Sequence, residues 1–345
     1  MYAWSRQMVQ RSQRRLRNRR QPIALVLMYH RVADLATDPQ LLAVSPKHFE
    51  EQLQVLCTLA HPLRLSELCQ ALQMGTLPDR SVVITFDDGY ADNLYCARPL
   101  LARYDVPATI FVTAGYVGNN REFWWDELER LLLQPGTLPE HLHLHLDGST
   151  YQRQAGEAAV YTETEHQRHR DWHIERVDDP TPRHRLYRDL YHRLHLLGAS
   201  ERRRVVHELR VWANIDAAGR PTHRILTHEE LIALADDDVI EIGAHTLTHP
   251  PLAALSSAEQ RQEIAGSKRS LENNLGRVVA SFAYPHGSLS AETVAEVRAA
   301  GFTCACSSEP NVVWPDADHF QLPRVVARDW DGDTFARWLK GWIGG

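Results

Sequence analysis

Four short apolar runs in this sequence each lead into a cluster of polar residues, and this arrangement limits the folds open to the chain. The runs begin near residues 24, 82, 240 and 281, and stretches with helical spacing separate them. An apolar run without alternation predicts a strand buried on both faces, as in a parallel sheet. Polar clusters at the carboxyl ends of separate strands are typical of the catalytic rim of an α/β barrel. We therefore expect an α/β fold of this kind.

Two adjacent carboxylates, Asp87 and Asp88, follow the second of these runs. Like charges at close range repel and resist desolvation, so a buried pair is tolerated mainly where a cation or a proton transfer uses both. Gly89 allows the backbone to turn immediately after them. The pair therefore indicates a chemical site, and the alternative is an ordinary solvated turn.

Two histidines four residues apart, His245 and His249, follow the third apolar run. Two prolines come directly after His249, so the pair cannot lie in a regular helix of the HExxH type. One carboxylate and two neutral imidazoles form a three-ligand set for a divalent cation, with open positions for water and substrate. Asp88, His245 and His249 are the predicted ligands.

Four motifs carry a resemblance to a known family. They are LMYHRV, TFDDGY, HTLTH and FAYPHG, in this order, within residues 22–116 and 226–330. With them the chain resembles the polysaccharide deacetylases of the NodB homology domain, carbohydrate esterase family 4. The resemblance implies an irregular (β/α)7-type TIM-like barrel with an inserted mixed α/β subdomain. It also implies that Asp87 is the general base and that Asp88, His245 and His249 bind a divalent cation, with Zn²⁺ expected first and Co²⁺ or Ni²⁺ as alternatives.

The third motif departs from the pattern Arg-x-Pro-Tyr that many members share. Ala283 stands in place of the arginine and His286 in place of the tyrosine. The segment instead resembles the FAYPxG branch, which includes deacetylases of poly-N-acetylglucosamine. There the backbone N–H at the position of His286 is expected to contribute to an oxyanion hole, a role that survives a change of side chain. Substrate contacts are expected from Tyr90, Tyr284 and Pro285.

A second departure concerns the general acid, because the late Leu-x-His motif of many members is not evident. In the branch that this chain resembles, the histidine of the opening motif takes that place, which makes His30 the predicted general acid. Its alternative is a strand-end histidine bonded to backbone. Arg324 could orient Asp87 or the acid in place of the lost arginine, or could be a surface residue.

The predicted activity is that of a metal-dependent hydrolase that removes N-acetyl groups from a sugar of a cell-surface polysaccharide or its precursor. In this reaction Asp87 takes a proton from metal-activated water and His30 protonates the departing amine, so the enzyme cleaves a C–N amide bond that is not a peptide bond. No GxSxG nucleophile motif is present. The alternatives are an O-deacetylase or a small-molecule amidase on the same scaffold, and an inactive glycan-binding module.

The predicted organisation has four parts: a basic arm at 1–20, a first barrel part at 21–116, an insertion at 117–225 and a second barrel part at 226–345. The insertion is expected to form a lid or a wall of the substrate groove. Its Trp124 and Trp125 could stack on a sugar ring, although core packing is the alternative for Trp125.

Composition and charge bear on compartment and partners. The first twenty residues contain seven arginines and no acid, which could give a weak peripheral membrane contact. They lack the apolar segment of a signal peptide, and the five cysteines show no CxxC pair or disulfide framework, so we expect a cytoplasmic protein. The expected partner is an N-acetylated glycan or its precursor, without nucleic acid, in exopolysaccharide biosynthesis.

Overall fold

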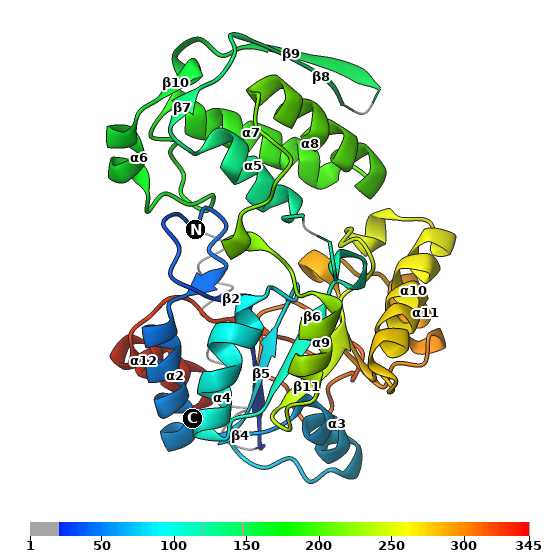
Figure 1. Ribbon diagram of the computed structural model, residues 1–345. Coiled ribbons are helices and arrows are strands. Elements are labelled where there is room, and N and C mark those ends of the chain that lie inside the picture. Colours follow the sequence, from blue (N-terminus) through cyan, green and yellow to red (C-terminus); the bar gives the residue numbers. More distant parts are fainter. Residues whose placement is uncertain (1–20, 120, 147, 345) are drawn as a thin grey trace, which may run out of the picture. The chain divides into compact units, whose positions relative to one another are not determined.

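The protein, seen in a computed structural model that describes residues 21–119, 121–146 and 148–344, divides into two compact units. Among these residues unit 1 takes in 21–34, Ala43–Val117 and 226–344, and unit 2 takes in Leu35–Leu42 and Gly118–Ile225 (Figure 1). The predicted basic arm at 1–20 lies outside the described residues.

The segment Leu35–Leu42 corrects the predicted boundaries, which assigned it to the first barrel part. It belongs to unit 2 because its polar groups bond there. Thr37 Oγ1 donates to Glu129 at 2.8 Å, and Gln40 Nε2 donates to the Tyr187 hydroxyl at 2.6 Å. A short stretch between two segments of unit 1 therefore completes the second unit.

Unit 1 is built around one parallel sheet of eight strands. Its order is β13-β12-β11-β6-β5-β1-β14, with β4 paired to β5. The strands are β1 (Ala24–Tyr29), β4 (His61–Pro62), β5 (Ser81–Phe86), β6 (Ala108–Val112), β11 (Ile240–Ala244), β12 (Ser281–Ala283), β13 (Cys304–Cys306) and β14 (Val325–Val326). Because all pairs are parallel, every strand ends at the same edge, and the polar clusters come together there.

The sheet curls without closing into a complete barrel. β13 and β14 are its edge strands, and the chain just before β14 links them, because Leu322 forms a parallel bridge with Cys306. The predicted fold class is confirmed as a mixed α/β fold whose parallel sheet forms a half-barrel. A small parallel pair, β2 (Arg31–Val32) with β3 (Ala43–Val44), follows β1.

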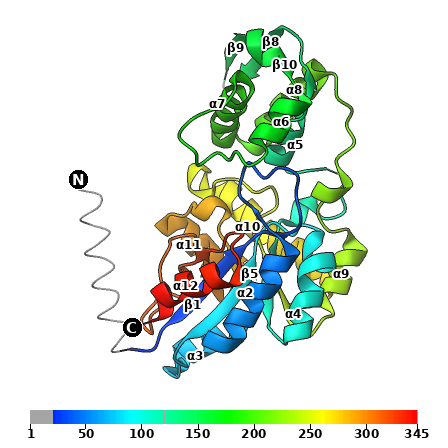
Figure 2. The ribbon, with the colours of Figure 1, turned by 90° about the vertical axis from the view of Figure 1, so that its left-hand side faces the viewer.

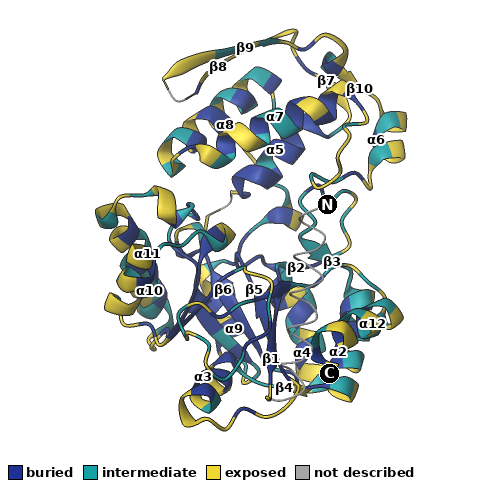
Figure 3. Ribbon diagram, turned by 180° about the vertical axis from the view of Figure 1, so that it is seen from behind, coloured by how far each residue is buried: buried dark blue, intermediate teal, exposed yellow. Residues whose placement is uncertain are grey.

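Helices surround the sheet and bury its outer face. Residues at alternate positions of β1 separate into two apolar clusters, with Leu25 and Leu27 on the outer side and Ala24 and Val26 on the inner side. In Figure 3 the strands are accordingly almost continuously buried. The helices of unit 1 are α2 (Pro46–Leu59), α3 (Leu65–Met74), η1 (Asn93–Ala97), α4 (Arg98–Tyr104), η2 (Ala114–Tyr116), α9 (His228–Ala235), η5 (Leu252–Ala254), α10 (Ser257–Leu275), η6 (Pro285–Gly287), α11 (Ala291–Ala299) and α12 (Gly332–Ile343). A capping box formed by Thr227 and Glu230 opens α9.

Unit 2 is a mixed subdomain with its own core. Strand β8 alternates exposed histidines with buried leucines, as its HLHLHL sequence predicts, and it pairs in antiparallel fashion with β9. Helices α5, α7 and α8 pack together, as Figure 2 also shows. The elements are α5 (Trp124–Leu132), β7 (Gly136–Thr137), β8 (His141–Leu146), β9 (Ser149–Gln154), η3 (Gly156–Ala159), β10 (Val160–Tyr161), α6 (Glu163–His169), α7 (Pro182–Leu196), α8 (Ala199–Ala213) and η4 (Pro221–His223).

The part of the chain that the structure describes contains no helix with both the length and the hydropathy needed to cross a bilayer.

Candidate metal and catalytic site

Three segments that follow neighbouring strands bring the predicted site together inside unit 1. Asp87 and Asp88 come directly after β5, and His245 comes directly after β11. β6 lies between these two strands in the sheet. The two-residue period of a strand turns Thr85 and Asp87 to the inner side of the curved sheet, because Ile84 and Phe86 belong to the outer core. The site therefore lies at the carboxyl edge.

Asp88, His245 and His249 form a buried group whose ligand atoms all lie within 4.8 Å of one another. Nε2 of His249 is 3.3 Å from Oδ1 of Asp88, and Nε2 of His245 is 3.8 Å from the same oxygen. No other side-chain group of this kind occurs among the described residues. The three predicted ligands thus converge on one point.

The orientation of the His245 ring is set by a backbone carbonyl. Its Nδ1 lies 2.8 Å from the carbonyl oxygen of Ala283, in β12. A carbonyl oxygen can only accept, so Nδ1 carries the hydrogen, and in the neutral ring Nε2 presents its lone pair toward Asp88. This is the tautomer and the second-sphere contact that metal-binding histidines usually have.

The environment of Asp88 suits a cation. Its side chain is 2% exposed, and its Oδ1 accepts no hydrogen bond from any described residue. Without a cation, burial raises the pKa of this carboxyl. An oxygen with no hydrogen-bond donor, facing two imidazole nitrogens, is costly to bury unless a positive charge lies among them. The donor set of one oxygen and two nitrogens fits a divalent transition metal such as zinc.

Asp87 has the opposite environment, because it forms a buried ion pair with Arg324. Nη1 of Arg324 donates to Oδ1 of Asp87 at 2.6 Å and Nη2 donates to Oδ2 at 2.8 Å. Although burial opposes ionisation, the charge and hydrogen bonds of Arg324, with contributions from His245 and His30, hold the pKa of Asp87 far below its ordinary value. Asp87 is therefore ionised throughout the neutral range, and Arg324, which is 1% exposed, is not a surface arginine.

Two further residues hold Arg324 in place, and sequence reasoning missed both. Its Nε donates to the carbonyl oxygen of Ser307 at 2.9 Å, and its Nη1 also donates to Oγ1 of Thr85 at 3.1 Å. Thr85 could have been found, because it stands two residues before Asp87 on the same face of β5. Ser307 acts through its main chain, which leaves no signal in the sequence.

His30 lies next to this group at the end of β1. It is half-buried, and no hydrogen bond of its ring occurs among the described residues, so the alternative of a ring bonded to backbone is not what the structure has. Burial lowers the pKa of His30, and the nearby charges of Asp88 and Asp87 oppose that shift. The main chain of His30 is held by Asn93, whose Nδ2 donates to its carbonyl oxygen at 2.9 Å.

Several site residues have left-handed backbone conformations. Asp88, Thr246, His249 and His286 have φ values of 74°, 64°, 59° and 56°, and they are four of the eight described residues other than glycine with positive φ. Such conformations cost free energy and persist only where surrounding contacts hold them, which is common at functional sites.

The third motif places an imidazole beside the ligands. The ring of His286 is exposed, and its centroid is 4.6 Å from that of His249 at an angle of 80°. Gly287, at φ 64°, has no room for a side chain, because a Cβ there would be 1.9 Å from Oγ of Ser308. The left-handed turn thus keeps the backbone of His286 close to the cluster.

The residues predicted to contact substrate, Tyr90, Tyr284 and Pro285, are all buried. The guanidinium of Arg31 covers the ring of Tyr90 at 4.4 Å from its centroid. Tyr284 donates its hydroxyl to the carbonyl oxygen of Phe320 at 2.9 Å. Each ring is therefore held by contacts within the protein, and substrate contact by these residues stays a prediction.

Trp124 and Trp125 belong to the core of unit 2 and not to an open sugar platform. They are 6% and 5% exposed. Trp125 stacks on Phe123 with centroids 4.4 Å apart, and Trp124 stacks on Tyr191 at 5.1 Å. Because protein side chains pack on these aromatic rings, core packing accounts for the positions of both residues.

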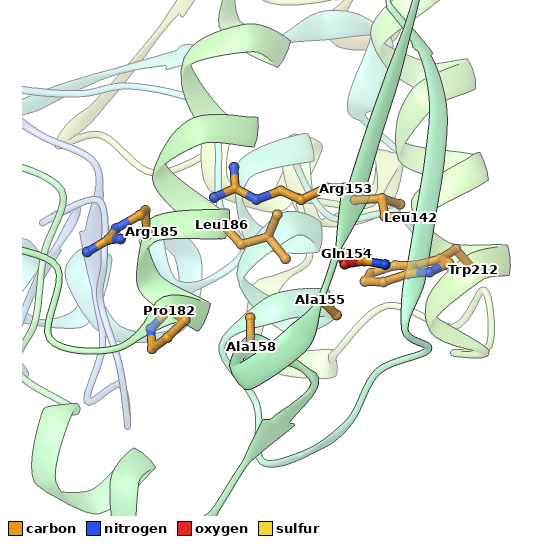
Figure 4. A pocket seen from close by; sticks show the side chains of 9 residues that line it. All are labelled: Leu142, Arg153, Gln154, Ala155, Ala158, Pro182, Arg185, Leu186 and Trp212. Atoms are coloured by element: carbon orange, nitrogen blue, oxygen red, sulfur yellow. The ribbon is translucent and has the colours of Figure 1, made fainter.

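Unit 2 contains a small pocket of about 90 Å³ (Figure 4). Its lining residues are Leu142, Arg153, Gln154, Ala155, Ala158, Pro182, Arg185, Leu186 and Trp212. None of them is an acid, a histidine or a cysteine, so the pocket offers neither a ligand set nor a general base. The candidate chemistry remains with the cluster in unit 1.

A protein-family model covers the segments that carry this group of residues. The model of the family described as polysaccharide deacetylase matches residues 74–172 and 212–305, which is more than half of the chain and includes Asp87, Asp88, His245 and His249. The chain belongs to the polysaccharide deacetylase family. The resemblance drawn from the four motifs is thereby confirmed.

Curated relatives in this polysaccharide deacetylase family match part of the chain. Over 138 residues it is 31% identical to YxkH of Bacillus subtilis (strain 168), which is provisionally named a polysaccharide deacetylase. This match covers 39% of this chain and 48% of that protein. Over 109 residues it is 34% identical to a poly-β-1,6-N-acetyl-D-glucosamine N-deacetylase of Staphylococcus aureus (strain N315), covering 28% and 38%. The matches thus span less than half of these relatives.

Several solved structures share the fold at low sequence identity. IcaB from Ammonifex degensii superposes with a TM-score of 0.57 at 17% identity, covering 92% of this chain and 97% of that one. The Streptococcus pyogenes deacetylase PplD, solved in complex with acetate, gives 0.53 at 18% identity, covering 92% and 98%. This likeness supports the half-barrel architecture of the polysaccharide deacetylases.

Proposed function

We propose that this polysaccharide deacetylase is a metal-dependent N-deacetylase that acts on a glycan containing N-acetylglucosamine. The observation that carries the proposal is the buried group of Asp88, His245 and His249 beside the ion pair of Asp87 and Arg324. The named N-deacetylases among the relatives act on poly-β-1,6-N-acetyl-D-glucosamine, which supports a substrate of this class.

Asp88, His245 and His249 would hold the divalent cation. When bound, the cation would supply Lewis acidity, which lowers the pKa of a water molecule and polarises an amide carbonyl. Asp88 contributes the negative charge, and the Nδ1–H bond of His245 to Ala283 directs its Nε2 toward the shared point. Burial of all three excludes bulk water from their lone pairs, which strengthens their attraction for a cation.

Asp87 would act as the general base. Arg324 keeps it ionised and fixes both of its oxygens, so the carboxylate is oriented before substrate arrives. The attacking water gives its proton to Asp87 as the new C–O bond forms at the acetyl carbon. The low pKa makes Asp87 a weak base, so its contribution depends on a water molecule that has already been acidified.

His30 would act as the general acid, and the main chain at His286 would stabilise the oxyanion. When the C–N bond breaks, the sugar nitrogen takes a proton from His30 and leaves as an amine, while the acyl part leaves as acetate. Burial lowers the pKa of His30, and the two nearby carboxylates offset only part of that shift. The left-handed turn at His286 supports a role for its backbone N–H as oxyanion donor.

The experiment that tests this proposal measures two products at once. Oligomers of β-1,6-linked N-acetylglucosamine are incubated with metal-free protein and with protein reloaded with zinc, cobalt or nickel, and released acetate and new amine are quantified. We expect equal amounts of both, only in the reloaded samples. Acetate from an O-acetylated oligomer without amine would identify an O-deacetylase, and metal binding without any product would favour the inactive glycan-binding module.

A further inference from the structure

The loop that carries His249 depends on a carboxylate from helix α10. Residues 245–250 form neither helix nor strand, so the loop cannot satisfy all of its own N–H groups. Oε2 of Glu263 accepts hydrogen bonds from the backbone N–H of Leu247 at 2.9 Å and of Thr248 at 2.8 Å. Oε1 of Glu263 accepts from the Thr248 hydroxyl at 2.6 Å. One side chain thus makes three bonds to two consecutive residues between the ligands.

The same face of α10 packs closely against this loop. Gly266 stands one helical turn after Glu263, and a Cβ there would lie 2.6 Å from Cδ1 of Leu247. On the opposite side, Gly115 donates its N–H to the carbonyl oxygen of Leu247 at 3.0 Å, and a Cβ at Gly115 would lie 2.4 Å from that oxygen. Leu247 is therefore held between η2 and α10, with no side chain separating it from either.

The hydrogen bonds to Glu263 hold residues 246–249 in a strained backbone conformation. Thr246 and His249, on either side of the two residues that Glu263 binds, both have left-handed backbones. Oγ1 of Thr246 also accepts from the N–H of His249 at 3.0 Å, which closes the turn from inside. If the carboxylate were absent, two N–H groups would lose their partner, and the turn could relax to ordinary backbone angles, carrying the His249 ring away from Asp88.

From these contacts we infer that Glu263 is a positioning residue, whose carboxylate clamps the two-histidine loop and so sets the affinity and geometry of the metal site. The inference rests on the proposed metal dependence. Glu263 does not touch the ligand atoms themselves, and it acts through the backbone of residues 247 and 248. Partners one shell beyond a metal ligand typically change metal affinity by about 10–100-fold when they are removed.

The test compares Glu263→Ala with Glu263→Gln and with Glu259→Ala as a matched control. Glu259 lies on the same helix, and its side chain accepts hydrogen bonds from the backbone N–H and the hydroxyl of Ser256 in a capping box. Zinc affinity is measured by competition with a chromogenic chelator, the visible spectrum of the cobalt-loaded protein reports ligand geometry, and melting temperatures report stability. At saturating zinc, kcat and KM are measured with the oligomer.

For Glu263→Ala we expect zinc affinity to fall by about 10–100-fold, with an altered cobalt spectrum and a loss mainly in kcat. Glu263→Gln should stay close to wild type, because its amide oxygen can accept both N–H bonds and its NH₂ can donate to the Thr248 hydroxyl. Glu259→Ala should lower the melting temperature without changing zinc affinity. If Glu263→Ala fails to fold, Thr248→Val, which removes one of the three bonds, should still lower affinity by about 2–10-fold.

Unchanged zinc affinity in Glu263→Ala, or an equal loss in Glu259→Ala, would overturn the positioning role and leave the proposed function intact. A wild-type protein that binds no zinc, cobalt or nickel would overturn both.

Discussion

Two neighbouring residues with the same side chain have opposite electrostatic environments in this protein. Arg324 and two histidines hold the pKa of Asp87 far below its ordinary value, while burial raises the pKa of Asp88. Pairs of titratable groups whose surroundings separate their pKa values commonly have distinct catalytic roles. This separation is consistent with the proposed roles of Asp87 as the ionised base and of Asp88 as a ligand of a cation.

Replacement of the two acids by asparagine should therefore separate metal binding from turnover. We expect Asp88→Asn to lower zinc affinity by more than about 100-fold, since it removes the charge of a direct ligand. Asp87→Asn should retain zinc and lose about 10²–10⁴-fold in kcat as the base disappears. Zinc content after dialysis and initial rates of acetate release measure the two effects. An equal loss of zinc in both variants would contradict the assignment.

The pairing with Arg324 predicts a pH dependence. Asp87 acts only when ionised, so activity would fall as pH drops through its pKa, which in the wild type lies below the ordinary range. Arg324→Lys keeps the charge but loses the two-pronged contact, so burial should then raise the pKa of Asp87. We expect the acidic limb of kcat/KM to move to higher pH.

The exposed Arg298, which pairs with Asp318, provides the control for this profile. Arg298→Lys should leave the acidic limb where it is. An Arg324→Lys profile that matches the wild type would show that the guanidinium does not set the state of Asp87.

At the level of elements, the site depends on how closely β11 and β6 approach inside the half-barrel. Gly243 faces inward, and a Cβ there would be 2.4 Å from Cδ1 of Phe111 and 2.7 Å from Oγ of Ser281. Gly243 stands two residues before His245 on the same face of β11. Close packing against the Phe111 ring thus explains why a glycine stands at position 243, just before His245. Glycines inside strands commonly mark such close approaches.

Gly243→Ala should destabilise unit 1 by about 1–3 kcal/mol, because Phe111 would have to leave its preferred position to admit one methyl group. Urea unfolding measures the free energy. Gly341→Ala serves as the comparison, since a Cβ at this position of α12 meets nothing within 4 Å and alanine favours a helix by roughly 1 kcal/mol over glycine. If Gly243→Ala were as stable as the wild type, the packing argument would be wrong.

At the scale of the whole molecule, the site gathers residues from nearly the full length of the chain. His30 directly follows the first strand and Arg324 directly precedes the last, and the segment 118–225 separates Asp87 and Asp88 from His245 and His249. A cation held by Asp88, His245 and His249 would connect β5 to β11 across the sheet, so its binding should stabilise unit 1 as a whole.

Removal of metal should therefore lower the melting temperature. Zinc at about 100 times its dissociation constant is expected to add about 2.7 kcal/mol, provided that it does not bind the unfolded chain. Differential scanning calorimetry with zinc and with a chelator measures the shift. Asp88→Asn should show little difference between the two conditions, and a wild-type protein indifferent to the chelator would argue against a structural contribution of the metal.

Much of this site could be predicted from the sequence, because its residues follow apolar runs that can only be buried parallel strands. Asp88, His245 and His249 belong to that class. The burial of Tyr90, Tyr284, Trp124 and Trp125 could not be predicted, because an aromatic residue beside a motif has the same sequence signature whether it faces a substrate or the core. Burial separates the two cases, and burial is a property of the folded chain.

The sequence by itself determined the strand pattern, the fold class and the identity of the chemical groups, since these follow from local periodicity and from the chemistry of carboxylates and imidazoles. Only the tertiary structure decided that Arg324 pairs with Asp87, that Ala283 orients His245 and that Glu263 holds the histidine loop. These contacts join residues far apart in the sequence, some through backbone atoms that every residue has, so no local pattern can encode them.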